Sequence, residues 1–268
     1  MLKNVLLYPS GLGQLKKGLE STPNIIKQMI DSNKHCVKVV DIQKQDTIEK
    51  SLFKLYGECI SSQDTNIIIG GDHSMSVATL QASLYKQPET KVLWIDAHAD
   101  INTFQSSKTN NIHGMPLGIV TNINTGKNMR FHDSLLNYSN VMYLGLRDID
   151  DYEKKVIEDN SINVITTQDI MMDIDDSISR LDSFIGKSPL HISLDVDVLD
   201  PIYMPCTGTP VKKGLDIDTL KHLLYHLKNK NVLQMDIAEL NLELGTERQT
   251  FQALSIIKYL LRDYLTIK

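Results

Sequence analysis

The sequence predicts an α/β protein: a single doubly wound domain over residues 1–268, with a mostly parallel sheet of about eight strands flanked by helices. Short apolar runs alternate with helix-like segments to the end of the chain. Most of these runs are continuously apolar, as in strands buried on both faces of a parallel sheet. Since no linker rich in Pro, Gly or Ser interrupts the pattern, we expect one domain.

The elements follow from apolar runs and from the segments between them. The predicted strands are 4–9, 36–42, 65–71, 91–98, 140–148, 162–167, 190–197 and 231–240. The predicted helices are 23–32, 47–61, 74–85, 150–159, 175–185 and 217–229. The longest stretch without a clear element is 101–128, rich in Asn, Thr and Ser. Loops of that length are usually functional or disordered, and we predict a function for its first half.

Composition excludes several classes of protein. With 41% hydrophobic and 23% charged residues, the chain is typical of soluble globular proteins. A net charge of -5 without a Lys/Arg cluster argues against a nucleic-acid partner and favours a small or cationic ligand. No secretory signal or membrane-spanning run is recognisable. The three cysteines, Cys36, Cys59 and Cys206, are too scattered for a disulfide framework or a cysteine-ligated zinc site, so we expect a cytoplasmic protein.

Groups able to bind a metal follow several predicted strands directly. In an open parallel sheet the carboxyl ends of the strands share one edge, where ligands bind. The side chains brought there are His73 in "GGDHS", Asp96, His98 and Asp100 in "DAHAD", Asp195 and Asp197 in "SLDVD", and Glu239 in "DIAEL". The two histidines and four aspartates among them are the candidate metal ligands.

Four unpaired carboxylates at one edge would repel one another unless cations neutralise them. A lone His or Asp-x-Asp at a strand end is more often a turn or a helix cap, but the combination of all these segments favours metal binding. Six protein ligands exceed the needs of one tetrahedral zinc ion, so two ions with bridging carboxylates are expected. Carboxylates with some imidazole favour Mn²⁺, with zinc as the alternative.

Five motifs carry a resemblance to a known family. In order and spacing, "GGDHSM", "DAHADIN", "NNIHGMP", "SLDVDVLDP" with "TGTPV", and "DIAELN" resemble the motifs of the ureohydrolases, and within that family most closely those of the arginase branch. The match runs from about Gly70 to Asn241. The segment before Asn66 matches poorly and is assigned no role.

The resemblance implies a binuclear manganese site that hydrolyses L-arginine to L-ornithine and urea through a hydroxide between the ions. One ion is expected on His73, Asp96, Asp100 and Asp195, and the other on Asp96, His98, Asp195 and Asp197. His113 matches the family's proton shuttle, and Glu239 matches the carboxylate that orients the guanidinium group. Asp100 is also expected to accept a hydrogen bond from the hydroxide and to help move its proton.

The resemblance also implies which residues bind the α-carboxylate and α-ammonium groups of the substrate. Asn102, Ser107, Thr109 and Asn111 are expected to hold the α-carboxylate, and Asp150 the α-ammonium group. Glu153 matches a nearby carboxylate, and Thr209 a threonine close to the metals. Agmatine lacks the carboxylate, so a site built to bond that group should reject it. Without the resemblance, Asp150 would be interpreted as a cap of the following helix, and His113 as a loop histidine bonded to backbone.

Other functions remain open from the sequence. A ureohydrolase acting on agmatine, guanidinobutyrate or formiminoglutamate is the first alternative, followed by a metal-dependent deacetylase, which keeps fewer ligands. A non-catalytic protein with this fold would have lost a ligand or Glu239. Trimers or hexamers occur in the family, which leaves a homo-oligomer open for this chain. However, the sequence ends at "LRDYLTIK", without the C-terminal extension that wraps a neighbouring subunit in some members.

Overall fold

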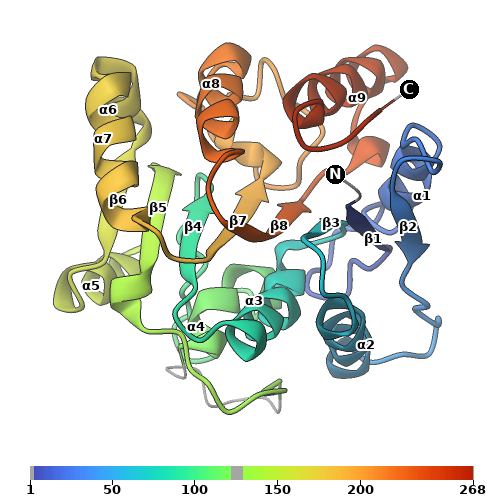
Figure 1. Cartoon of the computed structure of the whole chain (residues 1–268), viewed down its shortest axis with the longest axis horizontal. Coiled ribbons are helices and arrows are strands. Elements are labelled where there is room, and N and C mark those ends of the chain that lie inside the picture. The colour runs from blue at the N-terminus through green and yellow to red at the C-terminus, as the bar shows by residue number, and fades with distance from the viewer. Residues whose placement is uncertain (1–2, 122–128, 268) are drawn as a thin grey trace.

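The computed structural model describes residues 3–121 and 129–267, and within these ranges the strands form one parallel sheet of eight strands. The strand order is β2-β1-β3-β8-β7-β4-β5-β6, and Figure 1 shows the helices in two layers around this sheet. The strands are β1 (Asn4–Tyr8), β2 (Cys36–Val39), β3 (Asn66–Gly70), β4 (Lys91–Ile95), β5 (Val141–Leu146), β6 (Asn163–Thr166), β7 (Leu190–Asp195) and β8 (Val232–Ala238). Each lies within a predicted range, so the predicted fold class is confirmed.

The helices cover both faces of the sheet. They are α1 (Thr22–Lys27), α2 (Ile48–Ser61), α3 (Ser76–Lys86), α4 (Pro116–Val120), α5 (Asp151–Asp159), α6 (Thr167–Met172), α7 (Ile174–Ile185), α8 (Ile217–Leu227) and α9 (Glu247–Leu261). One face packs against α1 and α6 to α9, and the other against α2 to α5 (Figure 1). The central strands are therefore shielded from water on both sides, which explains their continuous apolar runs.

Several helix boundaries differ from the prediction. The predicted helix 23–32 ends at Lys27, and Ile30 instead forms an antiparallel bridge with Ile267. The predicted helix 74–85 begins with a separate 3₁₀ turn, His73–Met75. α4, α6 and α9 are additional to the predicted ranges. The second half of the loop 101–128 contains α4, while residues 122–128 lie outside the described part of the chain.

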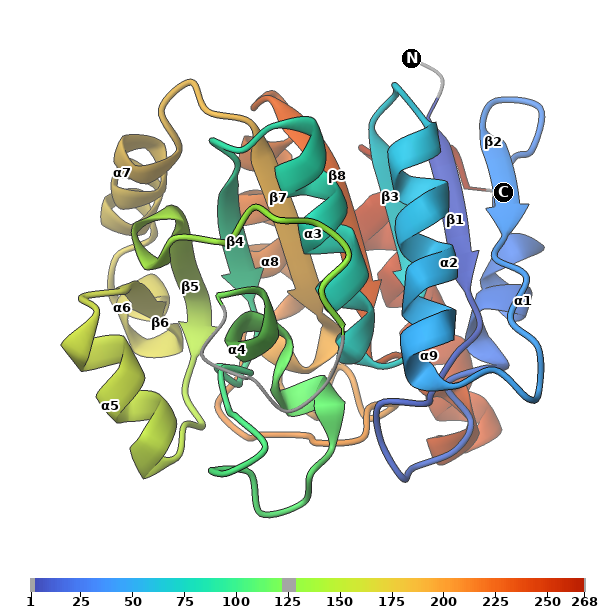
Figure 2. The ribbon, with the colours of Figure 1, turned by 90° about the horizontal axis from the view of Figure 1, so that it is seen from below.

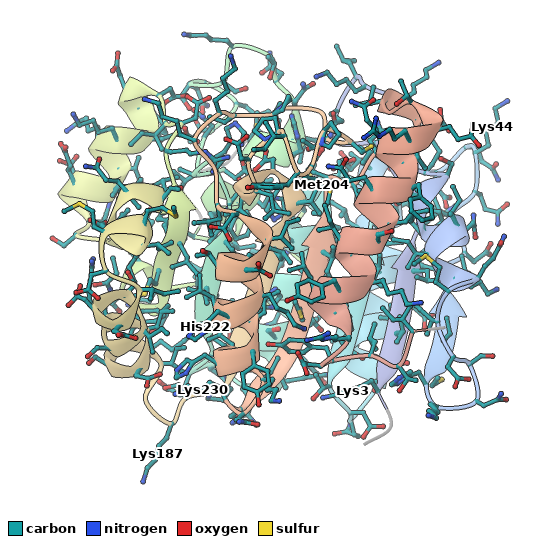
Figure 3. The ribbon with its side chains drawn as sticks, turned by 90° about the horizontal axis from the view of Figure 1, so that it is seen from above. Lys3, Lys44, Lys187, Met204, His222 and Lys230 are labelled. Carbon is teal, nitrogen blue, oxygen red and sulfur yellow. The ribbon has the colours of Figure 1, made fainter. Side chains whose placement is uncertain are left out.

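The four strands that precede the candidate ligands are neighbours: β3, β8, β7 and β4 occupy the middle of the sheet in that order. Their arrowheads point to the same end in Figure 2, where the long loop after β4 also lies. In Figure 3, Met204 lies toward this end, whereas Lys187 and Lys230 lie at the opposite end. Strand order thus brings together segments that are far apart in sequence.

Among the described residues, no helix combines the length and the apolar character needed to cross a bilayer.

Candidate active site

His73 is held by a stacking contact on one face of its ring and by polar contacts at both ring nitrogens. It begins a 3₁₀ turn whose N-cap, Asp72, accepts a hydrogen bond from the Ser74 amide at 2.9 Å. Its ring stacks on the indole of Trp94, with centroids 4.2 Å apart and planes 13° from parallel. Both side chains are fully buried, so the ring has one orientation.

A chain of hydrogen bonds determines which nitrogen of His73 carries a proton. Ser76 donates to Asp236 Oδ2 at 3.0 Å, because a carboxylate only accepts. The hydroxyl of Ser193 therefore donates to Ser76 (3.1 Å), and Ser193 in turn accepts from His73 Nε2 (2.9 Å). In a neutral ring this leaves Nδ1 with a lone pair and no hydrogen.

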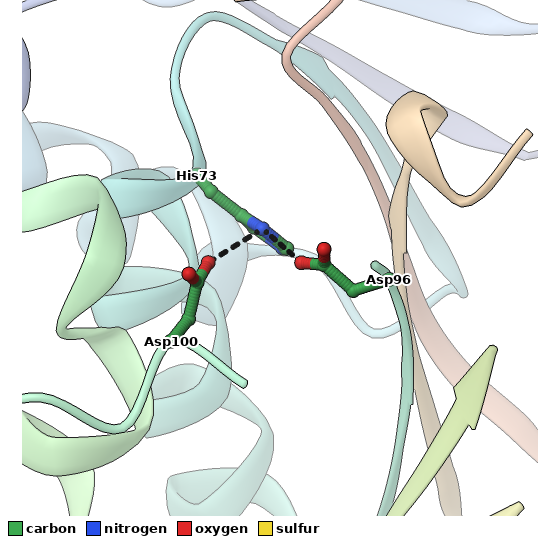
Figure 4. A group of neighbouring side chains, drawn as sticks. All are labelled: His73, Asp96 and Asp100. Atoms are coloured by element: carbon green, nitrogen blue, oxygen red, sulfur yellow. Dashed lines mark ion pairs between the residues drawn. The ribbon is translucent and has the colours of Figure 1, made fainter. Parts of the chain in front are cut away.

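Three carboxylate oxygens surround that lone pair. His73 Nδ1 lies 3.0 Å from Asp96 Oδ2, 3.1 Å from Asp100 Oδ2 and 3.3 Å from Asp195 Oδ2. Figure 4 shows His73 between Asp96 and Asp100. Four electron-rich atoms at these distances repel one another unless a cation lies among them. The donor set therefore fits a divalent metal ion.

A second group of donors adjoins the first and shares Asp96. His98 Nδ1 lies 3.0 Å from Asp197 Oδ2 and 3.4 Å from Asp96 Oδ1. On its other edge, Nε2 faces Asp148 at 3.7 Å, the type of outer carboxylate that orients metal-binding histidines. Ligand atoms of Asp96, His98 and Asp197 all lie within 4.8 Å of one another, as do those of His73, Asp96 and Asp100.

The pKa values of the clustered carboxylates and imidazoles are also shifted by their close approach to one another. Burial, with Asp197 and Asp96 nearby, raises the pKa of Asp195 well above its usual range. Burial and Asp96 likewise raise the pKa of Asp197 to about 6. Burial alone would lower the pKa of His98. The hydrogen bonds with Asp197 and Asp96 outweigh this effect of burial and raise the pKa of His98 to about 12. The protein alone thus balances these charges only by holding protons, a role that metal ions can take over.

Two site residues adopt left-handed backbone conformations. Asp100 has φ of 49° and Glu239 has φ of 64°. Such conformations are unfavourable for residues other than glycine and cluster at functional sites. At Asp100 the left-handed conformation lies in the loop after β4 and turns the carboxylate toward His73. At Glu239 it follows β8 and places the carboxylate where the His73 amide donates to Oε1 at 2.8 Å.

Glu239 is also close to His113. Its Oε1 lies 3.1 Å from His113 Nδ1. Burial lowers the pKa of His113, but the interaction with Glu239 outweighs burial and raises it to about 9. Burial would raise the pKa of Glu239, but His113 and the His73 amide keep it below its ordinary value. At neutral pH the pair is therefore an imidazolium and a carboxylate.

A cavity of about 250 Å³ opens above the metal-ligand candidates. Its lining includes Asn102, Asp150, Glu153 and Thr209 from the predicted substrate-binding set. Asn102 donates to Asp150 Oδ2 at 2.9 Å, and Thr209 donates to Asp197 Oδ2 at 3.2 Å. The structure thus brings these four residues to one cavity.

Asp150 also caps α5, as the alternative interpretation predicted. Its side chain accepts from the Glu153 amide at 2.9 Å, and Glu153 accepts from the Asp150 amide at 3.2 Å. Glu153 also accepts from the Ile101 amide at 3.3 Å. Burial and nearby Asp100 raise the pKa of Glu153 to about 8.

The remaining predicted carboxylate-binding residues lie farther out. Ser107, Thr109 and Asn111 are not among the described residues that line the cavity. Ser107 Oγ and Thr109 Oγ1 are 3.5 Å apart, and the Asn111 amide donates to Thr109 Oγ1 at 3.2 Å. They therefore form the outer part of the same loop, with their hydroxyl groups engaged with each other.

Sequence reasoning missed several residues that contact the site. Asp148 ends the predicted strand 140–148 and Ser193 begins the motif "SLDVD", but neither residue was assigned a role from the sequence. Gln14, in the segment assigned no role, reaches Glu239. The position of Asp148 just after a strand could have identified it as a site residue. No sequence pattern pointed to Gln14.

The fold and the two donor clusters define an α/β protein with a candidate metal site at the carboxyl ends of its central strands. The family model described as "Arginase family" matches residues 9–261. Arginase from Saccharomyces cerevisiae is 32% identical over 246 residues, covering 87% of this chain and 73% of the yeast protein. Arginase from Staphylococcus aureus strain MSSA476 is 30% identical over 95% of both chains. Among solved structures, Entamoeba histolytica arginase in complex with L-ornithine superposes with a TM-score of 0.89 at 25% identity, covering 97% of this chain and 98% of that one.

The chain belongs to the arginase family. It is accordingly a ureohydrolase, a hydrolase of the arginase type, with a cluster of His and Asp residues that could hold metal.

Proposed function

We propose that this protein hydrolyses L-arginine to L-ornithine and urea with two Mn²⁺ ions bound per chain. The observation that carries the proposal is the pair of donor clusters that share Asp96 beneath the cavity. One ion would be held by His73, Asp96, Asp100 and Asp195, and the other by Asp96, His98, Asp195 and Asp197. The relatives named arginase and the L-ornithine complex of the Entamoeba enzyme support this choice of substrate.

The chemistry of the donors supports manganese. Four carboxylates and two imidazoles, without a thiolate, suit Mn²⁺ better than zinc. When bound, the ions would lower the pKa of a water molecule and supply hydroxide as the nucleophile near neutral pH.

The roles of the protein's own residues follow from their positions. Glu239, an anion buried beside the clusters, would pair with the guanidinium group and hold its carbon in place. Asp100, whose pKa is raised by burial and Asp96, would take up the proton that the nucleophile releases. His113, protonated at neutral pH, would donate a proton to the δ-nitrogen of the departing ornithine.

The outer part of the cavity would recognise the α-ammonium and α-carboxylate groups of L-arginine. Asp150 would pair with the α-ammonium group beside Asn102. Asn102, Ser107, Thr109 and Asn111 would hydrogen-bond the α-carboxylate. Glu153 would support this loop through the Ile101 amide, and Thr209 would hold Asp197 in place near the metals.

Metal analysis combined with two substrates tests the proposal. Manganese-loaded protein should contain about two Mn²⁺ per chain. It should also release urea from L-arginine with a kcat/KM about 100-fold or more above that for agmatine, because agmatine leaves the carboxylate donors unpaired. A preference for agmatine would contradict the substrate assignment, and protein that binds no Mn²⁺ would contradict the metal assignment.

A further inference from the structure

The loop after β1 contributes a side chain to the site from a part of the chain that carries no recognised motif. Gln14 Nε2 lies 2.9 Å from Glu239 Oε1 and 2.8 Å from Oε2. Because a carboxylate only accepts, the amide nitrogen must be the atom that faces it. One neutral NH₂ group thus spans both oxygens of the carboxylate that is proposed to hold the guanidinium group.

Gln14 cannot easily move away from Glu239, because the residue before it is anchored. The Gly13 amide donates to Asp72 Oδ2 at 2.8 Å, and the Gly13 carbonyl accepts from the amides of Ile112 (2.7 Å) and His113 (3.2 Å). A Cβ at Gly13 would lie 2.2 Å from Asp72 Oδ1, so only glycine permits this approach. The same contacts tie the loop to the two segments that carry His73 and His113.

A second anchor lies on the other side of Gln14. Lys16 Nζ donates to the carbonyl of Gly208, in the "TGTPV" segment next to Thr209. With Gly13 held on one side and Lys16 on the other, the Gln14 side chain extends from a short, anchored length of backbone. This geometry indicates that Gln14 keeps its hydrogen bonds to Glu239 when substrate binds and is not displaced by the substrate.

The remaining contacts of Glu239 show what this support does. Oε1 accepts from the His73 amide and lies 3.1 Å from His113 Nδ1. Gln14 alone among the described residues has a hydrogen bond to Oε2. The terminal torsion of a Glu side chain is broad and roughly two-fold, so without Gln14 the carboxylate would be held by one oxygen and could rotate.

We propose that Gln14 is a positioning residue that fixes the plane of the Glu239 carboxylate for the guanidinium group, an inference that rests on the proposed function. A neutral amide suits this role because it orients the carboxylate and leaves its negative charge available to the cationic substrate. A lysine at this position would also donate hydrogen bonds, but it would neutralise Glu239 and repel the guanidinium group.

Two substitutions with opposite kinetic signatures test the role. Gln14→Leu removes the donors, so kcat for L-arginine should fall about 10- to 100-fold through misplacement of the reacting carbon, with KM within about threefold of wild type. Gln14→Lys keeps a donor but adds a charge, so KM should rise about tenfold or more. Leu15→Ala, a change at the exposed neighbour in the same loop, should leave both constants unchanged. A general loosening of the loop would not separate kcat from KM in this way.

Crystal structures of manganese-loaded wild type and Gln14→Leu provide a readout that does not depend on activity. The Glu239 carboxylate should be rotated or occupy several positions in the variant, while metal content and melting temperature match wild type. An unchanged carboxylate would overturn the inference, as would wild-type kinetics or a lower KM at unchanged kcat in Gln14→Leu. If wild type releases no urea from L-arginine, the proposed function fails, and the structural comparison still decides the role of Gln14.

Discussion

The floor and the rim of the cavity satisfy their polar groups in different ways. The floor is defined as the metal-ligand candidates beneath the cavity: His73, Asp96, His98, Asp100, Asp195 and Asp197. The rim is defined as Asn102 and Asp150, which line the cavity, together with Ser107, Thr109 and Asn111, which lie farther out on the same loop as Asn102. In the floor, mostly buried carboxylates face imidazole nitrogens and one another. In the rim, exposed or half-buried amide, hydroxyl and carboxylate groups bond to each other or to backbone.

Because of this difference, the floor needs a bound cation and the rim does not need a bound ligand. With its carboxylates ionised, the floor has no favourable arrangement of charges without an added cation, because desolvated carboxylates at close range repel one another. The polar groups of the rim are already bonded and in contact with water, so they need no ligand for stability. Substitutions in the floor should therefore change metal content, whereas substitutions in the rim should change substrate affinity and leave metal content unchanged.

The largest expected effect lies in the floor. Asp197→Ala and His98→Ala should each lose one metal ion and reduce urea production from L-arginine about 1000-fold or more, because each removes a ligand of the second ion. Elemental analysis and urea assays measure both effects. Asp175→Ala, at an exposed position near the start of α7, is the control and should retain metal and activity. Full metal content in both floor variants would refute the binuclear assignment.

A smaller effect is expected in the rim, at Asp150. Asp150→Asn keeps the N-cap, since Asn caps helices as well as Asp does, but removes the charge that would pair with the α-ammonium group. KM for L-arginine should rise about 10- to 100-fold, with melting temperature and metal content unchanged. Asp150→Ala should in addition lose about 1 kcal/mol of stability through the missing cap. A wild-type KM in Asp150→Asn would reduce the role of Asp150 to capping.

The smallest effect concerns the His113–Glu239 pair between floor and rim. The pKa of His113 is raised from 6.5 to about 9, so the protonated ring stabilises the folded state. In metal-free protein this contribution should be complete below pH 6.5 and should disappear as pH rises through about 9.

Chemical denaturation of wild type and His113→Gln measures this contribution. The difference in free energy of unfolding should be on the order of 1 kcal/mol at pH 6 and should decrease by pH 10. His132→Gln, at a histidine away from the cavity, should show no comparable trend. A difference that stays constant with pH would contradict the protonated pair.

The strands and the candidate metal ligands were predictable for the same reason. A strand buried on both faces needs a continuous apolar run, and a group such as Asp96 or Asp195 immediately after such a run must lie at the carboxyl edge of the sheet. α4 and α6 are too short to show helical periodicity, and Ile170 of α6 is nevertheless buried in the core. Packing, more than local pattern, accounts for these short helices.

By itself, the sequence determined the parallel sheet, its site-bearing edge and the chemical types gathered there, because apolar pattern and spacing act locally along the chain. Tertiary structure alone decided which strands are neighbours, that Ser193 and Ser76 set the tautomer of His73, and that Gln14 reaches Glu239 across 225 positions. These contacts depend on strand order and on the close approach of loops at Gly13. A hydrogen bond forms between atoms that are close in space, and no short-range pattern records which distant segments the fold will bring together.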